Sequence, residues 1–529
     1  MAGIGFTLKK ALGESGRSGR WKVYVSAAFV AAGPWLITLI SLFALLWWGR
    51  LFGMNNDTRD LFFATVTYAM IGSNLISTTA QFFLTRYLAD ALYVEAHDRL
   101  LSAFTGMFVY TGVSALILTV AIQWSLPLPF AYKMWTAALT VVLTQLGLLM
   151  ILLSAAKAYR DIARGFLVGL GGLFLAAVLY GLWARATGTL PNGTTVLALF
   201  TLGQTLTLAW LGGVTVRDFP GQTPSLYELA PQYGRYPELL WIGLCYALTL
   251  WVDNGLYWWS PEHHEIVADS YRLAPAYDLA KFWTFLALVP GFTVFSVSIE
   301  TDFYQVFRRF YDAIERGDTL APIHLHEEEL RIGTKAALWT MAKVQAFVAL
   351  LAWVLALQVE RTFPDVVGVF QWTIIGSVPH MVWITAFLLL LYFDARKQGL
   401  WSAFIGVVAL LVCTRVALWY DWSPGSGYLL GAVVAMVISI LMLNRQVERL
   451  LYFAFYDPNG SRTRTIPPAA MPSVRLSRMG YPLVEELPEE EPGAARKKSQ
   501  PRWKPGMVLP SRKERHGKNA KSGKEEESR

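Results

Sequence analysis

Residues 135–155 read WTAALTVVLTQLGLLMILLSA, an uninterrupted apolar block without a charged side chain. A helix of about 20 apolar residues is long enough to cross the hydrocarbon core of a bilayer, which is about 30 Å thick. Such blocks recur along most of the 529-residue chain, which is 54% hydrophobic and 16% charged, with a mean hydropathy of +0.38. These values lie outside the range of soluble proteins. The sequence therefore predicts an all-α polytopic membrane protein.

The same criterion predicts about 12 transmembrane helices, divided equally by a polar connector at residues 217–236. The first six are Val23–Trp48, Leu61–Leu88, Leu101–Trp124, Trp135–Ala155, Ile162–Trp183 and Thr195–Val214. The second six are Leu239–Trp259, Ala274–Ile299, Ala336–Leu357, Val369–Phe393, Leu400–Trp419 and Tyr428–Leu443. The equal numbers indicate two six-helix bundles, residues 1–216 and 237–456, as in transporters built from repeats.

Lys and Arg are distributed unevenly over the loops. Alternate loops and the N-terminus together hold roughly three times as many as the remaining loops, and positive charge is retained on the cytoplasmic side. The sequence therefore predicts an inner-membrane protein with both termini and the connector in the cytoplasm. Most of the net charge of +8 lies in the tail 457–529, so nucleic-acid binding loses its main support. The tail composition cannot bury a core and predicts a disordered cytoplasmic segment.

Few motifs in the sequence indicate chemistry. Cys245 and Cys413 lie inside apolar blocks, where a thiol usually behaves as a small buried hydrophobe. The adjacent histidines in the loop 261–265 point in different directions and have no third ligand near them, so no metal site is predicted. A phosphate-binding loop of the Walker type does not occur. We expect no cofactor. Without such a loop the chain does not hydrolyse ATP by that route, so the energy for transport must come from elsewhere.

Polar and ionisable side chains inside the membrane are the default functional candidates, because burying them in hydrocarbon is costly. The candidates for a transport pathway in these spans are Gln81, Arg86, Asp253, Asn254, Asp278, Lys281, Lys343 and Arg415, with His380 nearby. Asp278 and Lys281 are three residues apart on one helical face and would neutralise each other. Alternatively, the set lines a hydrated lumen that binds sugar hydroxyls or amines, and Asp253 relays a coupling proton.

Prolines and aromatic residues mark two further kinds of candidate. Gly33 and Pro34 in the first span, and Pro290 in the eighth, are candidates for a kink or a gate. Residues 301–335 contain an amphipathic segment, in which the eighth span continues as a helix that lies on the inner leaflet. A docking face for a cytosolic partner is the second interpretation, and both can hold. The side chains proposed for docking are Phe303, Phe307, Arg308, Arg309 and Phe310.

Several short motifs are distributed over the spans and loops. They are the opening MAGIGF with LKK at 8–10, AGPW at 32–35, QFFLTRYLAD at 81–90, YGRYPE at 233–238, LWVDN at 250–254, VPGF at 289–292, IETDF at 299–303 and RFYD at 309–312. Together they resemble the motifs of the Pel exopolysaccharide transporter PelG family, in the MATE-like superfamily of oligosaccharide flippases. The resemblance covers residues 1 to about 455.

The resemblance implies a non-enzymatic inner-membrane component of the Pel machinery. It would work with a cytosolic glycosyltransferase and small membrane partners, and move a cationic amino-sugar polymer or its lipid-linked precursor. Acidic residues such as Asp253, Asp278 and Glu300 would suit such a cargo. Asn254 stands where a basic residue would be expected, which puts a charge-pair role of Asp253 in doubt. The tail beyond about residue 457 departs from the family pattern.

Three alternatives stay open from the sequence. A cation-coupled antiporter of small molecules on the same fold predicts proton- or sodium-dependent efflux. A membrane-embedded glycosyltransferase needs acidic residues at a loop, for which Asp57 and Asp60 are the best candidates. A scaffold of a polysaccharide synthase would recruit partners through the amphipathic segment and transport nothing.

Overall fold

The computed structural model describes residues 33, 36–93, 98–155, 158–218 and 236–455. In this part of the chain, 11 helices are long and apolar enough to cross a membrane. The first predicted span is described only as a shorter apolar helix, Leu36–Leu51, and its beginning lies outside the described residues. The prediction of an all-α polytopic membrane protein is confirmed.

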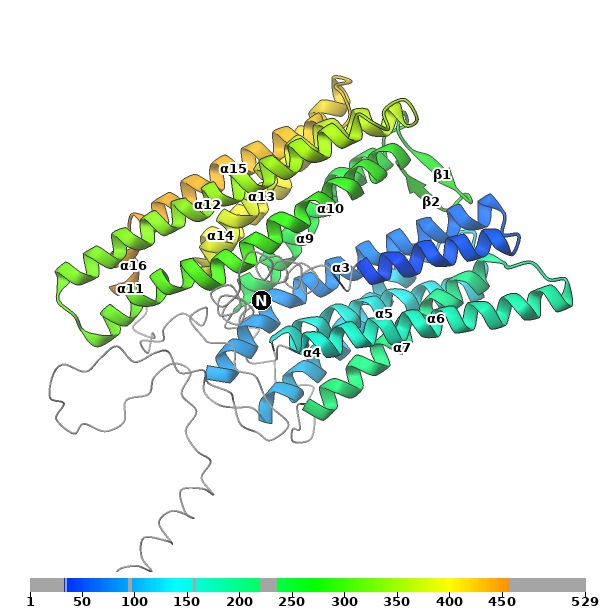
Figure 1. Ribbon diagram of the computed structural model, residues 1–529, viewed down its shortest axis with the longest axis horizontal. Helices are drawn as coiled ribbons and strands as arrows, with labels where there is room; N and C mark the ends of the chain where they lie inside the picture. The colour runs from blue at the N-terminus through cyan, green and yellow to red at the C-terminus, as the bar shows by residue number, and fades with distance from the viewer. Residues whose placement is uncertain (1–32, 34–35, 94–97, 156–157, 219–235, 456–529) are drawn as a thin grey trace, which may run out of the picture.

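The helices that precede residue 219 lie together in one half of the molecule (Figure 1). They are Leu36–Leu51, α3 (Asn56–Tyr93), α4 (Asp98–Gln123), α5 (Phe130–Ala155), α6 (Tyr159–Thr187) and α7 (Gly193–Asp218). Helix α5 packs against α3, α4 and α7, and α6 packs along α7. Leu139, Val196 and Phe200 are fully buried where these helices meet. Apolar side chains thus hold the half together.

The second half contains the remaining helices (Figure 1). They are α9 (Pro237–Trp258), α10 (Pro275–Ser298), the π-helical turn η1 (Ile299–Phe303), α11 (Tyr304–Arg316), α12 (Leu320–Ala356), α13 (Pro364–Tyr392), α14 (Arg396–Trp419), α15 (Ser426–Val447) and α16 (Leu450–Phe455). Helix α13 packs against α10, α12 and α15, and α14 packs against α9 and α15. Helix α13 is therefore the central helix of this half.

A short hairpin between α9 and α10 was not predicted from the sequence. Strands β1 (Glu265–Val267) and β2 (Tyr271–Leu273) pair antiparallel, with Ile266 opposite Arg272. Ala268 and Asp269 both have left-handed φ angles near +50°, as the central residues of a type I′ turn require. We call the end of the molecule that carries this sheet the hairpin end.

The amphipathic segment 301–335 continues the eighth span as a helix, as the sequence predicts, but it then turns back along itself. Helix α10 continues through η1 into α11 and ends at Gly317, whose φ of +70° is the left-handed conformation that commonly caps a helix. Helix α12 begins at Leu320 rather than at Ala336, and Pro322 lies in its first turn, where the missing N–H costs no hydrogen bond within the helix. The segment therefore forms a helical hairpin that is continuous with two spans.

The two halves touch along α3 and α9, which run side by side (Figure 1). A Cβ atom at Gly243 on α9 would lie 2.6 Å from the carbonyl oxygen of Thr78 and 2.7 Å from the Cα of Thr79. Only glycine permits the backbones to approach this closely. Where α3 and α9 cross beside Thr78 and Thr79, their close approach therefore depends on Gly243.

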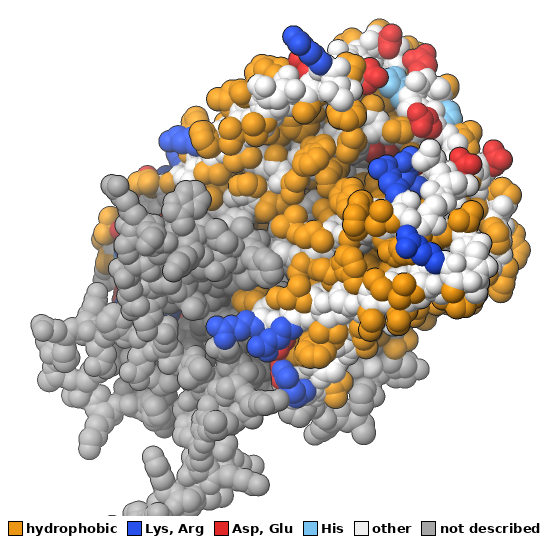
Figure 2. All heavy atoms as spheres, turned by 45° about the vertical axis from the view of Figure 1, so that its right-hand side comes forward, with side chains coloured by type: hydrophobic (Ala, Val, Ile, Leu, Met, Phe, Trp, Pro, Cys, Tyr) orange, Lys and Arg blue, Asp and Glu red, His pale blue; other side chains and the backbone are white. Residues whose placement is uncertain are grey.

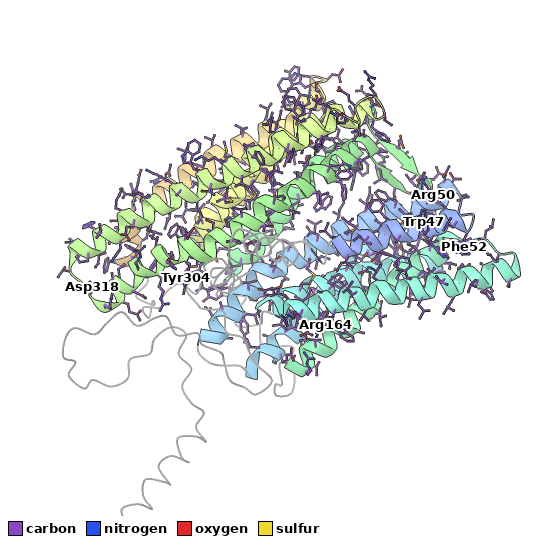
Figure 3. The ribbon with its side chains drawn as sticks, viewed as in Figure 1. Trp47, Arg50, Phe52, Arg164, Tyr304 and Asp318 are labelled. Atoms are coloured by element: carbon purple, nitrogen blue, oxygen red, sulfur yellow. The ribbon has the colours of Figure 1, made fainter. Side chains whose placement is uncertain are left out.

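The surface has the pattern of a bilayer-embedded protein. Figure 2 shows hydrophobic side chains over most of the described surface on one face, with charged side chains mainly toward its margins. Figure 3 places Trp47 and Arg50 at the hairpin end, and Tyr304 and Asp318 toward the opposite end. The loop after the first span and the segment after the eighth span thus lie at opposite ends of the molecule. The predicted topology places them on opposite sides of the membrane.

Candidate functional site

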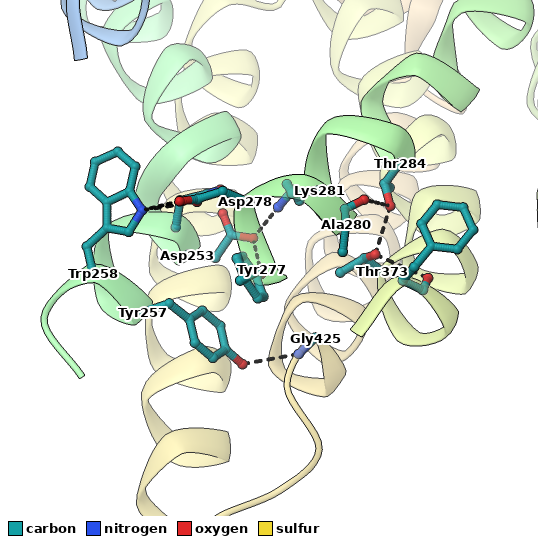
Figure 4. Close-up of polar contacts among 12 residues, drawn as sticks. Asp253, Tyr257, Trp258, Tyr277, Asp278, Ala280, Lys281, Thr284, Thr373 and Gly425 are labelled. Carbon is teal, nitrogen blue, oxygen red and sulfur yellow. Dashed lines mark hydrogen bonds and ion pairs between the residues drawn. The ribbon is translucent and has the colours of Figure 1, made fainter. Parts of the chain in front are cut away.

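An ion pair lies inside the second half of the molecule, between α9 and α10 (Figure 4). The Lys281 ammonium pairs with Oδ2 of Asp253, and the Tyr277 hydroxyl donates a hydrogen bond of 2.6 Å to the same oxygen. The side chains of Asp253 and Lys281 are 0% and 1% exposed. Burying two charges costs several kcal/mol per ion unless they compensate each other closely. Asp253 and Lys281 satisfy this condition.

Aromatic rings surround the ammonium group on its other sides. The Nζ atom of Lys281 lies 3.6 Å from the ring centroid of Tyr428 on α15 and 5.1 Å from that of Phe285. A desolvated ammonium is attracted to the face of an aromatic ring. Lys281 is thus held by one carboxylate and by aromatic faces, with little contact with solvent.

The predicted neutralisation of Lys281 by Asp278 is wrong, because Lys281 pairs with Asp253 instead. The Asp278 carboxylate turns toward α9 and toward the start of its own helix. There it accepts hydrogen bonds from Asn254 Nδ2 at 2.7 Å, from Trp258 Nε1 at 2.9 Å and from the backbone N–H of Ala274 at 3.0 Å. These donors saturate Asp278 and connect it to α9.

Further polar contacts extend from the ion pair toward α13 and α15. The hydroxyls of Thr284 and Thr373 are 2.7 Å apart and join α10 to α13. The backbone N–H of Gly425 donates a hydrogen bond of 3.1 Å to the Tyr257 hydroxyl. His380 is 1% exposed, and its ring centroid lies 5.5 Å from that of Tyr428. The polar network therefore spans four helices of the second half.

The sequence analysis missed the tyrosines of this network. Tyr277 lies four residues before Lys281 and thus on the same helical face, which is a signal that helical spacing could have given. Tyr257 and Tyr428 carry no comparable signal, because their contacts join residues far apart in the chain. A tyrosine in an apolar span is also a common interface anchor, so its presence alone does not predict a site.

Besides Arg86, which is described below, three pathway candidates do not join this network. Lys343 on α12 and Arg415 on α14 are exposed, each among exposed apolar side chains of the same helix. Gln81 is exposed on α3, in the other half of the molecule. Glu300 lies in the π-helical turn, and its side chain lies outside the described part of the structure. Helical position alone had grouped these residues with the ion pair.

Arg86 connects the two halves at the end opposite the hairpin. Its guanidinium lies 3.2 Å from both Asp90 and Asp394, and Arg396 lies 3.2 Å from Asp394. The Tyr236 hydroxyl donates a hydrogen bond of 2.8 Å to Asp90. We call these five residues the Arg86 cluster. The cluster joins α3 to the start of α9 and to the turn between α13 and α14.

At the hairpin end, Tyr68 on α3 makes a second contact between the halves. Its hydroxyl donates a hydrogen bond of 2.9 Å to the carbonyl oxygen of Arg272. Its ring centroid lies 4.8 Å from that of Trp258 and 4.9 Å from that of Tyr271. Burial raises the pKa of Tyr271 above its ordinary value, so this hydroxyl stays neutral over the physiological range. The hairpin is therefore attached to both halves.

The kink candidates are placed only in part. Gly33 is helical and buried, whereas Pro34 lies outside the described residues. Pro290 lies within α10 and is exposed, and the helix continues past it to Ser298. A proline removes one backbone hydrogen bond and weakens the helix there. The π-helical turn begins one residue after α10 ends.

The aromatic candidates for docking are covered by the chain itself. Phe303, Phe307 and Phe310 are at most 3% exposed, and the centroids of the first two lie 5.3 and 4.9 Å from that of Tyr392 on α13. A partner therefore cannot contact these rings without unfolding the helical hairpin formed by α11 and α12. The outward side of α11 is charged, and Arg309 there pairs with Glu329 on α12 at 3.4 Å. Arg308 pairs with Asp312 at 3.3 Å.

The arrangement of helices defines a class, the multi-pass membrane proteins with the MATE transporter fold. A MOP superfamily transporter from Pyrococcus furiosus is similar over 81% of this chain and 96% of its own, with 13% identity and a TM-score of 0.52. An outward-facing MATE family multidrug resistance transporter is similar over 80% and 96%, with 12% identity and a TM-score of 0.53. An inward-facing one is similar over 80% and 99%, with 13% identity and a TM-score of 0.50.

Identities this low show the fold alone, and the family follows from a different comparison. The PelG family model, described as "Putative exopolysaccharide Exporter (EPS-E)", matches residues 1–455. The chain belongs to this family. No curated protein matches the chain. The resemblance and the fold class predicted from the sequence are both confirmed, and the protein is a membrane transporter or flippase of an exopolysaccharide-exporter family.

Proposed function

We propose that the protein exports an exopolysaccharide, or its lipid-linked precursor, across the cytoplasmic membrane. The observation that carries this proposal is the match of the exporter family to residues 1–455 on a chain with the MATE fold. The chain itself is not an enzyme in this proposal, since it only provides the pathway. The hairpin end faces outward, and the N-terminus, the connector 217–236 and the tail 457–529 face the cytoplasm.

The two six-helix bundles, residues 1–216 and 237–456, move as separate bodies in this proposal. Similar folds are recorded in outward-facing and inward-facing conformations. In this chain the contacts that must break for either opening lie at opposite ends. They are the Arg86 cluster at one end, and the contact of Tyr68 with Arg272 and Trp258 at the other. Access then alternates between the two ends.

The cargo is a polymer with cationic amino sugars, as the family resemblance implies. The buried carboxylates do not provide its binding site, because Lys281 already compensates Asp253 and three donors saturate Asp278. Gln81 and Thr85 are exposed on α3, one turn apart. Their amide and hydroxyl groups can bind sugar hydroxyls without a charge. We propose these two residues as cargo contacts.

A cytosolic glycosyltransferase and small membrane proteins are the proposed partners. The outward side of the hairpin formed by α11 and the start of α12 is the proposed docking surface, since charged residues such as Arg309, Glu328 and Glu329 lie there. Charge complementarity would set the orientation of such a partner. This surface replaces the aromatic face expected from the sequence.

The proposal is tested by secretion from a deletion strain. Wild-type protein is expected to restore a secreted polymer that contains hexosamine. The double variant Gln81→Leu with Thr85→Val is expected to lower secretion while the protein stays in the membrane. The control is Thr340→Val, an exposed threonine on α12 whose hydroxyl bonds to its own helix. Secretion that does not depend on the gene, or a polymer without amino sugars, would overturn the proposal.

The second candidate is cation-coupled antiport of a small molecule. It is favoured by the likeness to a multidrug resistance transporter, which shows the fold alone, and by a charged pair inside the membrane, where such residues often serve ion coupling. Proteoliposomes loaded with a fluorescent organic cation separate the two candidates. Efflux driven by a proton or sodium gradient supports the antiporter, and its absence in vesicles of active protein supports the exporter.

A further inference from the structure

We propose that the ion pair between Asp253 and Lys281 is a proton-operated switch that couples export to a proton gradient. Asp253 is the group that takes up the proton, and Lys281 is the charge that its protonation releases. This inference rests on the proposed function, because it assigns an energy source to that transport. The first observation is the position of the pair.

The pair lies near the hairpin end of the membrane domain. Lys281 is in the second turn of α10, about 9 Å along the axis from Pro275, whereas Ser298 lies about 25 Å away in the other direction. The stacked rings of Tyr257 and Tyr277, with centroids 3.8 Å apart, lie beside the pair. A proton that arrives from the hairpin end therefore has the shorter path. This is the outer side in the proposed topology.

Asp253 has one carboxylate oxygen that is not engaged. Lys281 and Tyr277 both bind Oδ2, whereas the buried Oδ1 has no hydrogen-bond partner among the described residues. The His380 Nε2 atom and the Tyr428 hydroxyl are likewise buried and without such a partner in that part of the chain. Buried polar atoms are rarely left unsatisfied, and such exceptions often mark function or bound water. Three such atoms, from α9, α13 and α15, thus occur around Lys281.

The proton balance of the step is simple. A proton from the outer solution bonds to Oδ1 of Asp253, which changes from a carboxylate to a neutral acid. Lys281 keeps its own proton, so the net charge of the pair changes from zero to +1. A lone ammonium in a water-excluded site is unfavourable, and its attraction to a neutral acid is weak. Protonation therefore favours separation of α10 from α9 and hydration of Lys281.

The same geometry excludes two other roles for Asp253. The Lys281 ammonium already occupies the carboxylate, so a sodium ion or a cargo amine would have to displace a cation that the protein itself provides. A proton needs no such displacement, because Oδ1 remains available. Asp278 cannot substitute for Asp253, since both of its oxygens accept hydrogen bonds. The proton is thus the cation that fits.

Other titratable groups around the pair are few. Those that face it are Tyr257 on α9, Tyr277 and Asp278 on α10, His380 on α13 and Tyr428 on α15. The charged residues on the spans of the other packed helices are Arg86 on α3, Lys343 on α12 and Arg415 on α14. Arg86 belongs to its own cluster, and the other two side chains are exposed. Of the facing groups, Asp253 alone combines a carboxylate with an unengaged oxygen.

Infrared difference spectroscopy of the full-length protein in lipid nanodiscs tests the proton site. Spectra are recorded at about pH 8 and about pH 5, and their difference isolates the groups that change protonation between the two. The wild type is expected to gain a protonated-carboxyl band at the lower pH, and Asp253→Asn is expected to lose that band. A band that survives in Asp253→Asn and disappears in Asp278→Asn would overturn the assignment.

A double variant separates a switch from a merely structural ion pair. Asp253→Asn with Lys281→Met removes both charges, so a structural pair predicts that membrane level and export both recover. A switch predicts that the membrane level recovers while export remains lost. The control is Ser402→Ala with Ser439→Ala, which removes a buried hydrogen bond of the same bundle without a charge. Normal export by the charge-free variant would overturn the proposal.

The two proposals fail in different ways. If wild-type protein does not restore secreted polymer but the carboxyl band depends on Asp253, the exporter assignment and its coupling fail, and only the proton site at Asp253 is supported. If wild-type protein restores the polymer and the charge-free variant does so as well, the exporter assignment stands and the switch fails.

Discussion

The two bundles differ in the polar groups that they bury. In the described part of the first bundle, the buried polar side chains are Thr, Ser and Gln, and many of the hydroxyls bond to a carbonyl of their own helix, as Thr140 and Thr144 do. The second bundle buries Asp253, Lys281 and His380. A hydroxyl bonded within its helix needs no partner helix, whereas a buried charge needs one. The comparison indicates that the second bundle holds the groups that can respond to an ion.

The largest expected effect comes from removing one charge of the ion pair. Lys281→Met leaves the Asp253 carboxylate without its cation in a site that is 0% exposed. Breaking a buried pair costs about 3–5 kcal/mol, so we expect a large fall in thermal stability in detergent. The double variant with Asp253→Asn is the control, and it should recover most of the loss. Wild-type stability of Lys281→Met would mean that the second bundle tolerates a lone charge.

The next effect concerns the contact between the bundles. Gly243→Val places side-chain atoms against the backbone of Thr78 and Thr79 on α3, which cannot move aside. We expect a loss of about 1–3 kcal/mol, measured as a lower unfolding temperature. Gly171→Ala on α6 is the control, because its new Cβ meets no atom within 4 Å and should stabilise by up to about 1 kcal/mol. Equal effects would show that α3 and α9 are not tightly packed at Gly243.

A smaller effect is expected at the Arg86 cluster. Arg86→Gln removes two ion pairs of a side chain that is 18% exposed, and the expected loss of stability is about 1 kcal/mol or less. We expect a larger effect on how often the bundles separate at that end than on the free energy of unfolding. Alkylation of a cysteine introduced at Ala395, which is buried in the wild type, should therefore become faster. Arg164→Gln, at a pair whose arginine is 65% exposed, should leave the rate unchanged.

The smallest effect compares one threonine from each bundle. Thr144 bonds only within its own helix among the described contacts, whereas Thr373 also bonds to Thr284 on a neighbouring helix. Thr144→Val should change the free energy of unfolding by less than about 0.5 kcal/mol. Thr373→Val leaves a buried Thr284 hydroxyl without its partner across the helices and should cost about 1 kcal/mol. Equal losses would show that a hydroxyl bonded to a neighbouring helix contributes no more to stability than one bonded within its own helix.

Most of the membrane-spanning helices were predictable, because their length and lack of charge set their boundaries. The predicted span Leu101–Trp124 compares with a structural span of Leu100–Gln123. The start of α12 was not predictable in this way, because residues 320–335 carry many charges yet continue the helix beyond the apolar stretch. The β hairpin was missed for a different reason, since strands of three residues show no alternation.

The candidate site was predictable only as a set of helical positions. Asp253, Asn254, Asp278 and Lys281 were all identified, because ionisable and amide groups stand out in an apolar span. Their pairing was not predictable, since spacing gives the face of one helix but not the neighbour that the face meets. The same limit grouped Arg415 with them, although it lies on an exposed side of α14.

The unbroken course from α10 through η1 to α11 has a mechanical consequence. Pro275 and Arg316 are joined by about 60 Å of helix, with Lys281 near one end and the helical hairpin of α11 and α12 at the other. A helix transmits twist along its axis, and the π-helical turn is the place where the ladder of hydrogen bonds changes its spacing. Rotation of this continuous helix at the hairpin end would therefore reorient α11 at the opposite end, and a partner bound to α11 would resist the rotation.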